Sequence, residues 1–384
     1  MQITPVDNVL APGDYPLITY SGALNPAGGT LQPVHTTRLN LTLDTTVPGV
    51  VVLGVGGASA DLIWRGNVDS NWNINNTPNW TGGSNVFFDV DGVRFDDTAD
   101  RFDVDVAVDV RPGEIRFENQ VQAYQVGGPA SIRGQAPLWI TGGAGVAFTG
   151  SHEFSKIDVA AGPLEVDLGG VLAAAGATLV GSGGELRLDG GQLATSQLDV
   201  AGGGRLTGAG RIVGNTVIGD GTADAALFSP GFSPGTIEIE GELFLESNAE
   251  TQIEISGLAG NPHDMILVDG NATLGGTLVL SAIDGYVPTV GDQFTVMTSD
   301  ALVGGSVFAN VETSRSGDVL LWPTYDGANV MVIGGLVGDM DLSGLVDEDD
   351  IDLFAFAVRD NAAYDDALHA TEHEVADVDG NGRV

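Results

Sequence analysis

The chain of 384 residues contains no cysteine, a single lysine and only 14 basic residues in all, against 52 acidic residues. The absence of cysteine excludes disulfide bonds, thiolate nucleophiles and cysteine-ligated metals. The formal net charge of -38 repels phosphate groups. It therefore excludes nucleic acids and anionic membrane surfaces as partners, and it favours cations.

Long apolar runs are absent as well. The run at residues 47–55 is interrupted by glycine and falls short of the ~18 apolar residues of a membrane span, so we expect no span. The first five residues lack the basic start and the apolar centre of a signal peptide. We expect either a cytoplasmic protein or a fragment of a longer exported one, and the features below favour the exported fragment.

Glycine and short apolar segments are abundant. Residues 102–110 alternate apolar and acidic side chains, a pattern typical of a strand with one solvated face. Between residues 119 and 219, glycines separate short apolar segments at near-regular intervals. This pattern favours an all-β protein built either from the stacked coils of a β-solenoid or from β-sandwich modules.

Composition changes along the chain predict five modules. A Pro-Gly segment at residues 229–235 ends the Gly-rich stretch, and the character becomes helical and acidic after Gly335. The expected modules are the tail of a preceding β domain (1–57), a Trp-rich β module (58–118), a Gly-rich β-solenoid (119–219), a β-sandwich-like cap (220–335) and a small α-helical, EF-hand-like module (336–384).

Two distant segments of the sequence resemble each other. Residues 12–24 align with residues 290–302, and each segment is followed by a short apolar strand, at residues 49–54 and 328–334 respectively. An internal repeat of this kind indicates that one structural unit occurs twice. For this reason we interpret residues 1–57 as the end of a β domain whose beginning is missing.

Residues 339–350 have the ligand spacing of a calcium loop. Glycine occupies position 6, an apolar residue occupies position 8, and an amphipathic helix is expected over residues 351–358. Oxygen ligands at positions 1, 3, 5, 7, 9 and 12 suit a hard Ca²⁺ ion. The predicted ligands are Asp339, Asp341, Ser343, the carbonyl of Leu345, Asp347 and Asp350.

A second copy of this loop begins close to the end of the sequence. Asp377, Asp379 and Asn381 occupy its positions 1, 3 and 5, and the sequence ends after position 8. The oxygens at positions 9 and 12 are therefore missing, and we do not expect the second loop to hold calcium tightly.

The two loops together resemble the dockerin type I repeat over residues 338–384, since each reads Gly/Ala-Asp-x-Asp-x-Ser/Asn-Gly-x-Val. The resemblance implies paired calcium loop-helix units that fold with Ca²⁺ and bind a cohesin-like domain on a scaffold or cell surface. Glu348 and Asp349 differ from the small hydroxyl or apolar residues with which dockerins usually recognise their partners.

The rest of the chain resembles the autotransporter-associated β-strand repeats of large bacterial surface proteins. The resemblance rests on residues 62–66, Trp72, and residues 79–80, 87–89, 93–97 and 206–210, together with the Pro-Gly segment. It implies a β-helical, extracellular, non-catalytic stalk or adhesin. Trp64, Trp72 and Trp80 are interpreted as core residues, with stacking on sugar rings as the alternative.

These features favour a secreted or cell-surface bacterial protein without enzymatic activity, whose calcium-binding module docks to a cohesin-like or scaffold protein. The first alternative is a secreted polysaccharide-active enzyme, either a β-helix lyase or the accessory region of a hydrolase. Its candidate basic residues are Arg116, Arg133, Lys156, Arg187, Arg205 and Arg211. The second alternative is a module that binds extracellular polysaccharide without cleaving it.

Overall fold

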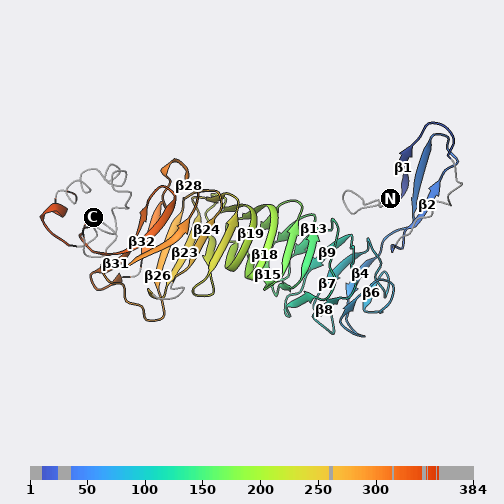
Figure 1. Ribbon diagram of the computed structural model, residues 1–384. Helices are drawn as coiled ribbons and strands as arrows, with labels where there is room; N and C mark the ends of the chain where they lie inside the picture. The colour runs from blue at the N-terminus through green and yellow to red at the C-terminus, as the bar shows by residue number, and fades with distance from the viewer. Residues whose placement is uncertain are drawn as a thin grey trace. The chain divides into compact units, whose positions relative to one another are not determined.

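The computed structural model describes residues 11–24, 36–258, 263–313, 315–339, 343, 345–351 and 353 (Figure 1). Nearly all of the secondary structure in this part of the chain is β-strand, which confirms the expected all-β class. The chain divides into two compact units. Residues 1–158 and 170–176 form the first unit, and residues 159–169 and 177–384 form the second.

The first unit begins with a three-stranded antiparallel sheet in the order β1-β3-β2. Its later strands pair in parallel, each with a strand one circuit of the chain further on, as in the series β4–β7–β9–β11 and β5–β8–β10–β12. The strands of this unit are β1 (Gly13–Thr19), β2 (Asn40–Asp44), β3 (Val50–Gly56), β4 (Asp61–Trp64), β5 (Asn71–Trp72), β6 (Trp80–Gly82), β7 (Gly92–Phe95), β8 (Asp103–Val106), β9 (Glu114–Phe117), β10 (Tyr124–Gly127), β11 (Leu138–Ile140), β12 (Val146–Phe148), β13 (Ser151–Phe154) and β16 (Val171–Ala174), and β14 (Ile157–Val159) contains the boundary between the units.

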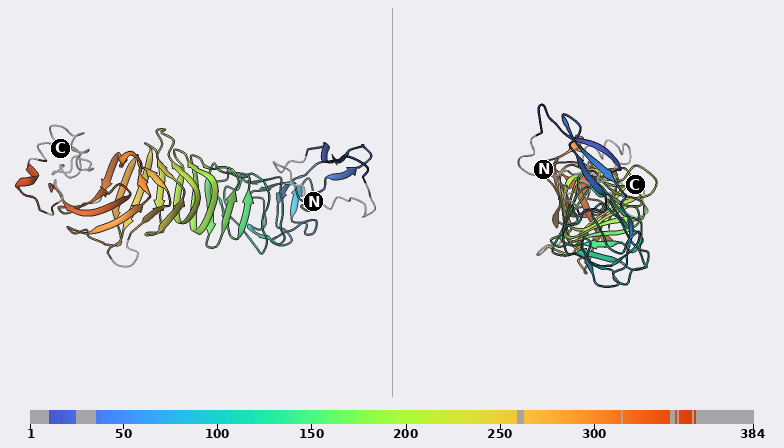
Figure 2. Two further views of the ribbon diagram at one scale, coloured as in Figure 1. Left: turned by 45° about the horizontal axis from the view of Figure 1, so that its top comes forward. Right: turned by 90° about the vertical axis from the view of Figure 1, so that its right-hand side faces the viewer.

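The second unit continues the same parallel pairing in three series, which run through β20, β21 and β22 after the long strands β18 and β19. The strands follow one another from green to orange in Figure 2. They are β15 (Gly162–Asp167), β17 (Thr178–Val180), β18 (Gly184–Val200), β19 (Arg205–Ile218), β20 (Ala226–Pro230), β21 (Thr236–Glu240), β22 (Leu243–Leu245), β23 (Ala249–Ile255), β24 (Met265–Val268), β25 (Asn271–Thr273), β26 (Thr277–Ala282), β27 (Gln293–Thr298), β28 (Ala301–Leu302), β29 (Asn310–Thr313), β30 (Arg315–Ser316), β31 (Val319–Tyr325) and β32 (Asn329–Leu336), with a short 3₁₀ helix η1 (Val303–Gly305) after β28.

The period-two pattern of the sequence explains which side chains are buried. Along β18, Leu186, Leu188, Leu193 and Leu198 are buried while the residues between them face outward or lie at corners. Each coil turns a corner where the next one passes very close. At Gly208, with φ of +89°, a Cβ atom would lie 2.2 Å from the carbonyl oxygen of Leu188. The positive φ and the short distance together require glycine at this position.

The parallel series end in antiparallel pairs. In the first unit, β4 pairs in parallel with β7 and antiparallel with β6. In the second unit, β27 pairs in parallel with β24 and antiparallel with β32. Where we expected a sandwich-like cap over residues 220–335, the parallel series continue as far as β29, and antiparallel pairing involves β27 and β30 to β32.

The three clustered tryptophans of the first unit lie in its core, which confirms the core interpretation. Trp64, Trp72 and Trp80 are all buried. The ring centroids of Trp64 and Trp80 are 5.0 Å apart, and those of Trp72 and Phe87 are 5.4 Å apart, in edge-to-face contacts. Such packing leaves no face of these rings for a sugar.

Past β32, the structure describes only parts of the expected helical module. Residues 348–351 form a short helical turn, and most of the expected helix over residues 351–358 lies outside the described residues. Among the residues that are described, no helix has the length and apolarity needed to cross a membrane.

Replacing Trp72 by alanine is expected to destabilise the first unit by about 3–5 kcal/mol, because the change leaves a cavity among packed rings. Chemical denaturation followed by tryptophan fluorescence and circular dichroism measures this loss. Val121→Ala is the matched control, because Val121 is 83% exposed and its removal should change stability by less than about 0.5 kcal/mol. Equal midpoints for the two variants would contradict the buried position of Trp72.

Candidate functional site

The predicted calcium loop begins directly after β32 and a glycine turn. Its first and last predicted ligands, Asp339 and Asp350, are only 1% and 4% exposed. The backbone N–H of Ser343 donates to Oδ1 of Asp339 at 2.9 Å, and that of Asp347 donates to Oδ2 of Asp350 at 2.7 Å. The carboxylates at positions 1 and 12 therefore hold the backbone of the loop around them.

The intermediate ligands lie nearer to solvent. Ser343, Leu345 and Asp347 are exposed, and the Ser343 hydroxyl lies 3.4 Å from both the N–H and the carbonyl oxygen of Leu345. Oδ1 of Asp347 accepts the N–H of Asp349 at 3.0 Å. The other predicted ligands lie outside the described residues: Asp341, Asp377, Asp379 and Asn381. Among the described residues, Asp339, Asp347 and Asp350 do not form a group of carboxylates close enough together to hold a metal ion. Calcium binding by the first and second loops therefore stays a prediction.

A second acidic group lies in the second unit. Glu165 and Asp167 on β15 and Asp189 on β18 each offer a carboxylate oxygen, and these oxygens lie within 4.8 Å of one another. The pairing of the two strands is the reason, since parallel register sets Asp167 opposite Asp189. Among the described residues, this group has the geometry to hold a divalent cation.

The sequence analysis did not single out this group. Its signal was available in the segments Glu165-Val166-Asp167 and Arg187-Leu188-Asp189, which alternate in the same way. Recognising the group required knowledge of which strands are neighbours, and period-two alternation does not contain that knowledge.

Burial and mutual repulsion shift the titration of this group. Burial raises the pKa of Glu165 and of Asp167, and the neighbouring Asp189 raises both further. Arg187, whose Nε lies 4.0 Å from Oε1 of Glu165, acts in the opposite direction. The group is therefore an electrostatic cost to the fold at neutral pH, and a bound cation would reduce that cost.

Most of the basic residues considered for lyase chemistry take part in contacts on the outer surface. Arg116 forms a two-point ion pair with Glu114, with both N–O distances at 3.0 Å. Arg133 bridges Asp109 and Glu153 at 2.8 and 3.0 Å. Arg187 forms an ion pair with Glu165, and Arg211 forms one with Glu240. The Lys156 ammonium lies 3.9 Å from the ring centroid of Trp139.

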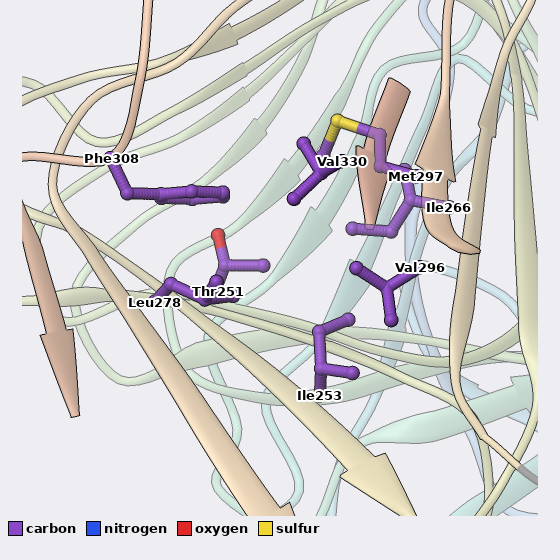
Figure 3. A pocket seen from close by; sticks show the side chains of 8 residues that line it. All are labelled: Thr251, Ile253, Ile266, Leu278, Val296, Met297, Phe308 and Val330. Carbon is purple, nitrogen blue, oxygen red and sulfur yellow. The ribbon is translucent and has the colours of Figure 1, made fainter. Parts of the chain in front are cut away.

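The interior of the second unit contains one small apolar space, shown in Figure 3. Its side chains leave no room for a water molecule, so it is part of the core and not a ligand site. It is lined by Thr251, Ile253, Ile266, Leu278, Val296, Met297, Phe308 and Val330.

Comparison with known proteins identifies no relative: no protein-family model and no curated protein matches the sequence. The candidate sites therefore rest on the geometry of this chain alone.

Asp167→Asn is expected to raise the melting temperature of the second unit at pH 7 by about 1–3 °C. The folded-state pKa of Asp167 is raised, so the stability that Asp167 contributes is present below its unfolded pKa near 4 and is lost as pH rises through its folded pKa. The gain should accordingly vanish near pH 3.

Differential scanning calorimetry at both pH values, with the exposed Asp224 changed to Asn as a control, measures this difference. A loss of stability in Asp167→Asn at pH 7 would show that the carboxylate stabilises the fold. It would contradict the interpretation that the group formed by Glu165, Asp167 and Asp189 destabilises the fold at neutral pH.

Proposed function

We propose that this chain is a non-catalytic structural protein of the bacterial exterior or cell surface, in which stacked β-solenoid coils carry a calcium-binding, dockerin-like docking module. The observation that supports it most is the parallel register, which stacks successive coils with their apolar side chains inside. A stack of this kind can present or space another domain without any site of its own.

The arrangement of charge supports the same role. Several of the few arginines pair with carboxylates of a neighbouring coil, as Arg133 does with Asp109 and Glu153 and as Arg211 does with Glu240. The excess of carboxylates on the outer surface gives a soluble body that repels other polyanions and attracts cations.

The docking role rests on the loop after β32. In this proposal Asp339, Asp341, Ser343, the carbonyl of Leu345, Asp347 and Asp350 surround Ca²⁺, and the ion fixes the following helix for a cohesin-like or scaffold partner. Asp339 and Asp350 are buried and accept hydrogen bonds from backbone N–H groups of the loop. These contacts support a loop that is organised before the ion binds.

A polysaccharide-active enzyme is the second candidate. One observation favours it: Arg187 lies beside the carboxylates Glu165, Asp167 and Asp189 on one outer face. In such an enzyme, a cation on the carboxylates would bind the acid group of a glycan, and the Arg187 guanidinium would add a second positive charge beside that group. Incubation of the full chain with acidic glycans and Ca²⁺, followed by ultraviolet detection of unsaturated products, separates the candidates. Products that disappear in Arg187→Ala would favour the enzyme.

Asp350→Ala is expected to weaken Ca²⁺ binding at least about tenfold, because position 12 supplies a main carboxylate ligand of the loop. Isothermal titration of the full chain with Ca²⁺ measures the change. Glu348→Ala is the matched control, since it removes a charge at position 10, which is not a ligand position. The unfolding of the stacked coils should be the same in both variants, and an unchanged titration in Asp350→Ala would falsify the calcium assignment.

A further inference from the structure

Two groups of three antiparallel strands in this chain have the same strand order. The first group is a separate sheet, whereas the second group, called the second sheet below, is part of the larger sheet, in which β30 also pairs with β31. In the first sheet β1 and β2 flank β3, and in the second β27 and β31 flank β32. In each case the central strand comes last of the three in the sequence. The repeated segments found in the sequence lie on these strands.

The register of the two sheets is also the same. Between β1 and β3 the pairing passes from Pro16–Val52 to Ile18–Val51, and one residue is left over. Between β27 and β32 it passes from Thr295–Met331 to Met297–Val330, again with one residue left over. The irregularity thus occurs at the same place, and it matches Ile18 with Met297. The sequence alignment had set Ile18 against Val296, one residue away.

The second sheet closes the end of a stack of coils. Strand β27 pairs in parallel with β24, with Met297 opposite Ile266. Figure 3 shows Val296, Met297 and Val330 of the sheet around the same small apolar space as Ile253 on β23 and Ile266 on β24. Met297 is 1% exposed as a result.

The corresponding side chains of the first sheet are also apolar, but they are more exposed to solvent. Ile18, the counterpart of Met297, is 39% exposed. Tyr15, Leu17, Leu41 and Leu43 are half-buried, whereas their counterparts are buried: Phe294, Val296, Leu321 and Pro323. Among the described residues β1 pairs only with β3, so its other edge offers backbone groups to a further strand.

We propose that the sheet of β1, β2 and β3 forms an end cap for the last coil of another β-solenoid module, which precedes this cap in a longer chain. The edge of β1 accepts a parallel strand of that coil as β27 accepts β24, and Tyr15, Leu17 and Ile18 close its core. The strand that pairs with β1 does not come from a second copy of the described region. In such a copy the equivalent strand, β24, already pairs with β27. This inference rests on the two sheets and is independent of calcium docking.

A cap exchange tests the proposal in the full chain. Residues 290–336 are replaced by a second copy of residues 11–57, which has the same length. The transplanted sheet is expected to close the last coil, so the chimera should unfold cooperatively within about 5 °C of the parent. A chimera that carries residues 58–104 at the same place is the length-matched control and should lose this transition.

Ile18→Asp then reports whether the edge of β1 is the docking edge. At its native position the exposed side chain should change the melting temperature by less than about 2 °C, whereas in the transplanted copy a buried carboxylate should lower it by about 10 °C or more. Val47→Asp in the transplanted copy is the matched control, because Val47 is an exposed loop residue of the same sheet. Equal effects of Ile18→Asp in both positions would overturn the proposal.

A smaller change keeps the test decisive if the chimera does not fold. The variant Phe294→Tyr, Val296→Leu and Met297→Ile gives β27 the side chains of β1 without altering any other part of the chain. If β1 is built to close a coil, this variant should melt within about 3 °C of the parent. A loss of about 10 °C or more would show that the side chains of β1 do not fit a coil, and it would contradict the proposal.

Discussion

The strands of the parallel series form their backbone hydrogen bonds with strands one circuit of the chain before or after them. A coil cannot satisfy its own N–H and C=O groups, because its strands face away from one another and bond only to the coils on either side. The stack therefore requires something different at each end. Within the first unit β4 has β6 as an antiparallel neighbour, and within the second unit β27 has β32 as an antiparallel neighbour. The same requirement explains why an apolar sheet with an open edge, such as the one formed by β1 to β3, is best understood as the end of a stack.

Parallel register also determines which charged side chains lie close together. It sets each residue beside its equivalent one coil further on, so similar sequences in successive coils bring like side chains together. For leucine and valine this builds a continuous core, and for Asp167 and Asp189 it builds a group whose carboxylates repel each other. With 14 basic residues in the chain, arginine offsets such repulsion at few places, among them Arg133 between Asp109 and Glu153. A protein of this composition has a physical reason to bind cations on its outer surface.

Local patterns in the sequence predicted the local features. Period-two alternation predicted the strands, and the clustering of Trp64, Trp72 and Trp80 predicted a core. The calcium loop expected from ligand spacing stays a prediction, although the structure shows that Asp339 and Asp350 are buried. The features that depend on distant pairing were not predictable in the same way. Alternation is identical in parallel and antiparallel strands, so it did not reveal that the parallel series run on past residue 220. The left-over residue in β1 and β27 likewise arises from pairing with β3 and β32, and the alignment of the two segments was therefore one residue out of register.

The absence of cysteine allows the parallel register to be tested directly with introduced pairs. Ala194 on β18 lies opposite Val213 on β19, and both side chains face outward. Residues opposite each other on neighbouring strands are about 4.8 Å apart, a separation that a disulfide spans, whereas Cα atoms more than about 7 Å apart cannot be bridged. Mild oxidation of the double variant Ala194→Cys, Val213→Cys should close a disulfide in nearly all molecules. The pair Gln192→Cys, Val213→Cys, which is displaced by two residues on the same face, should remain reduced. Closure of the displaced pair in preference to the opposed one would contradict the register on which the stack, its core and its ends depend.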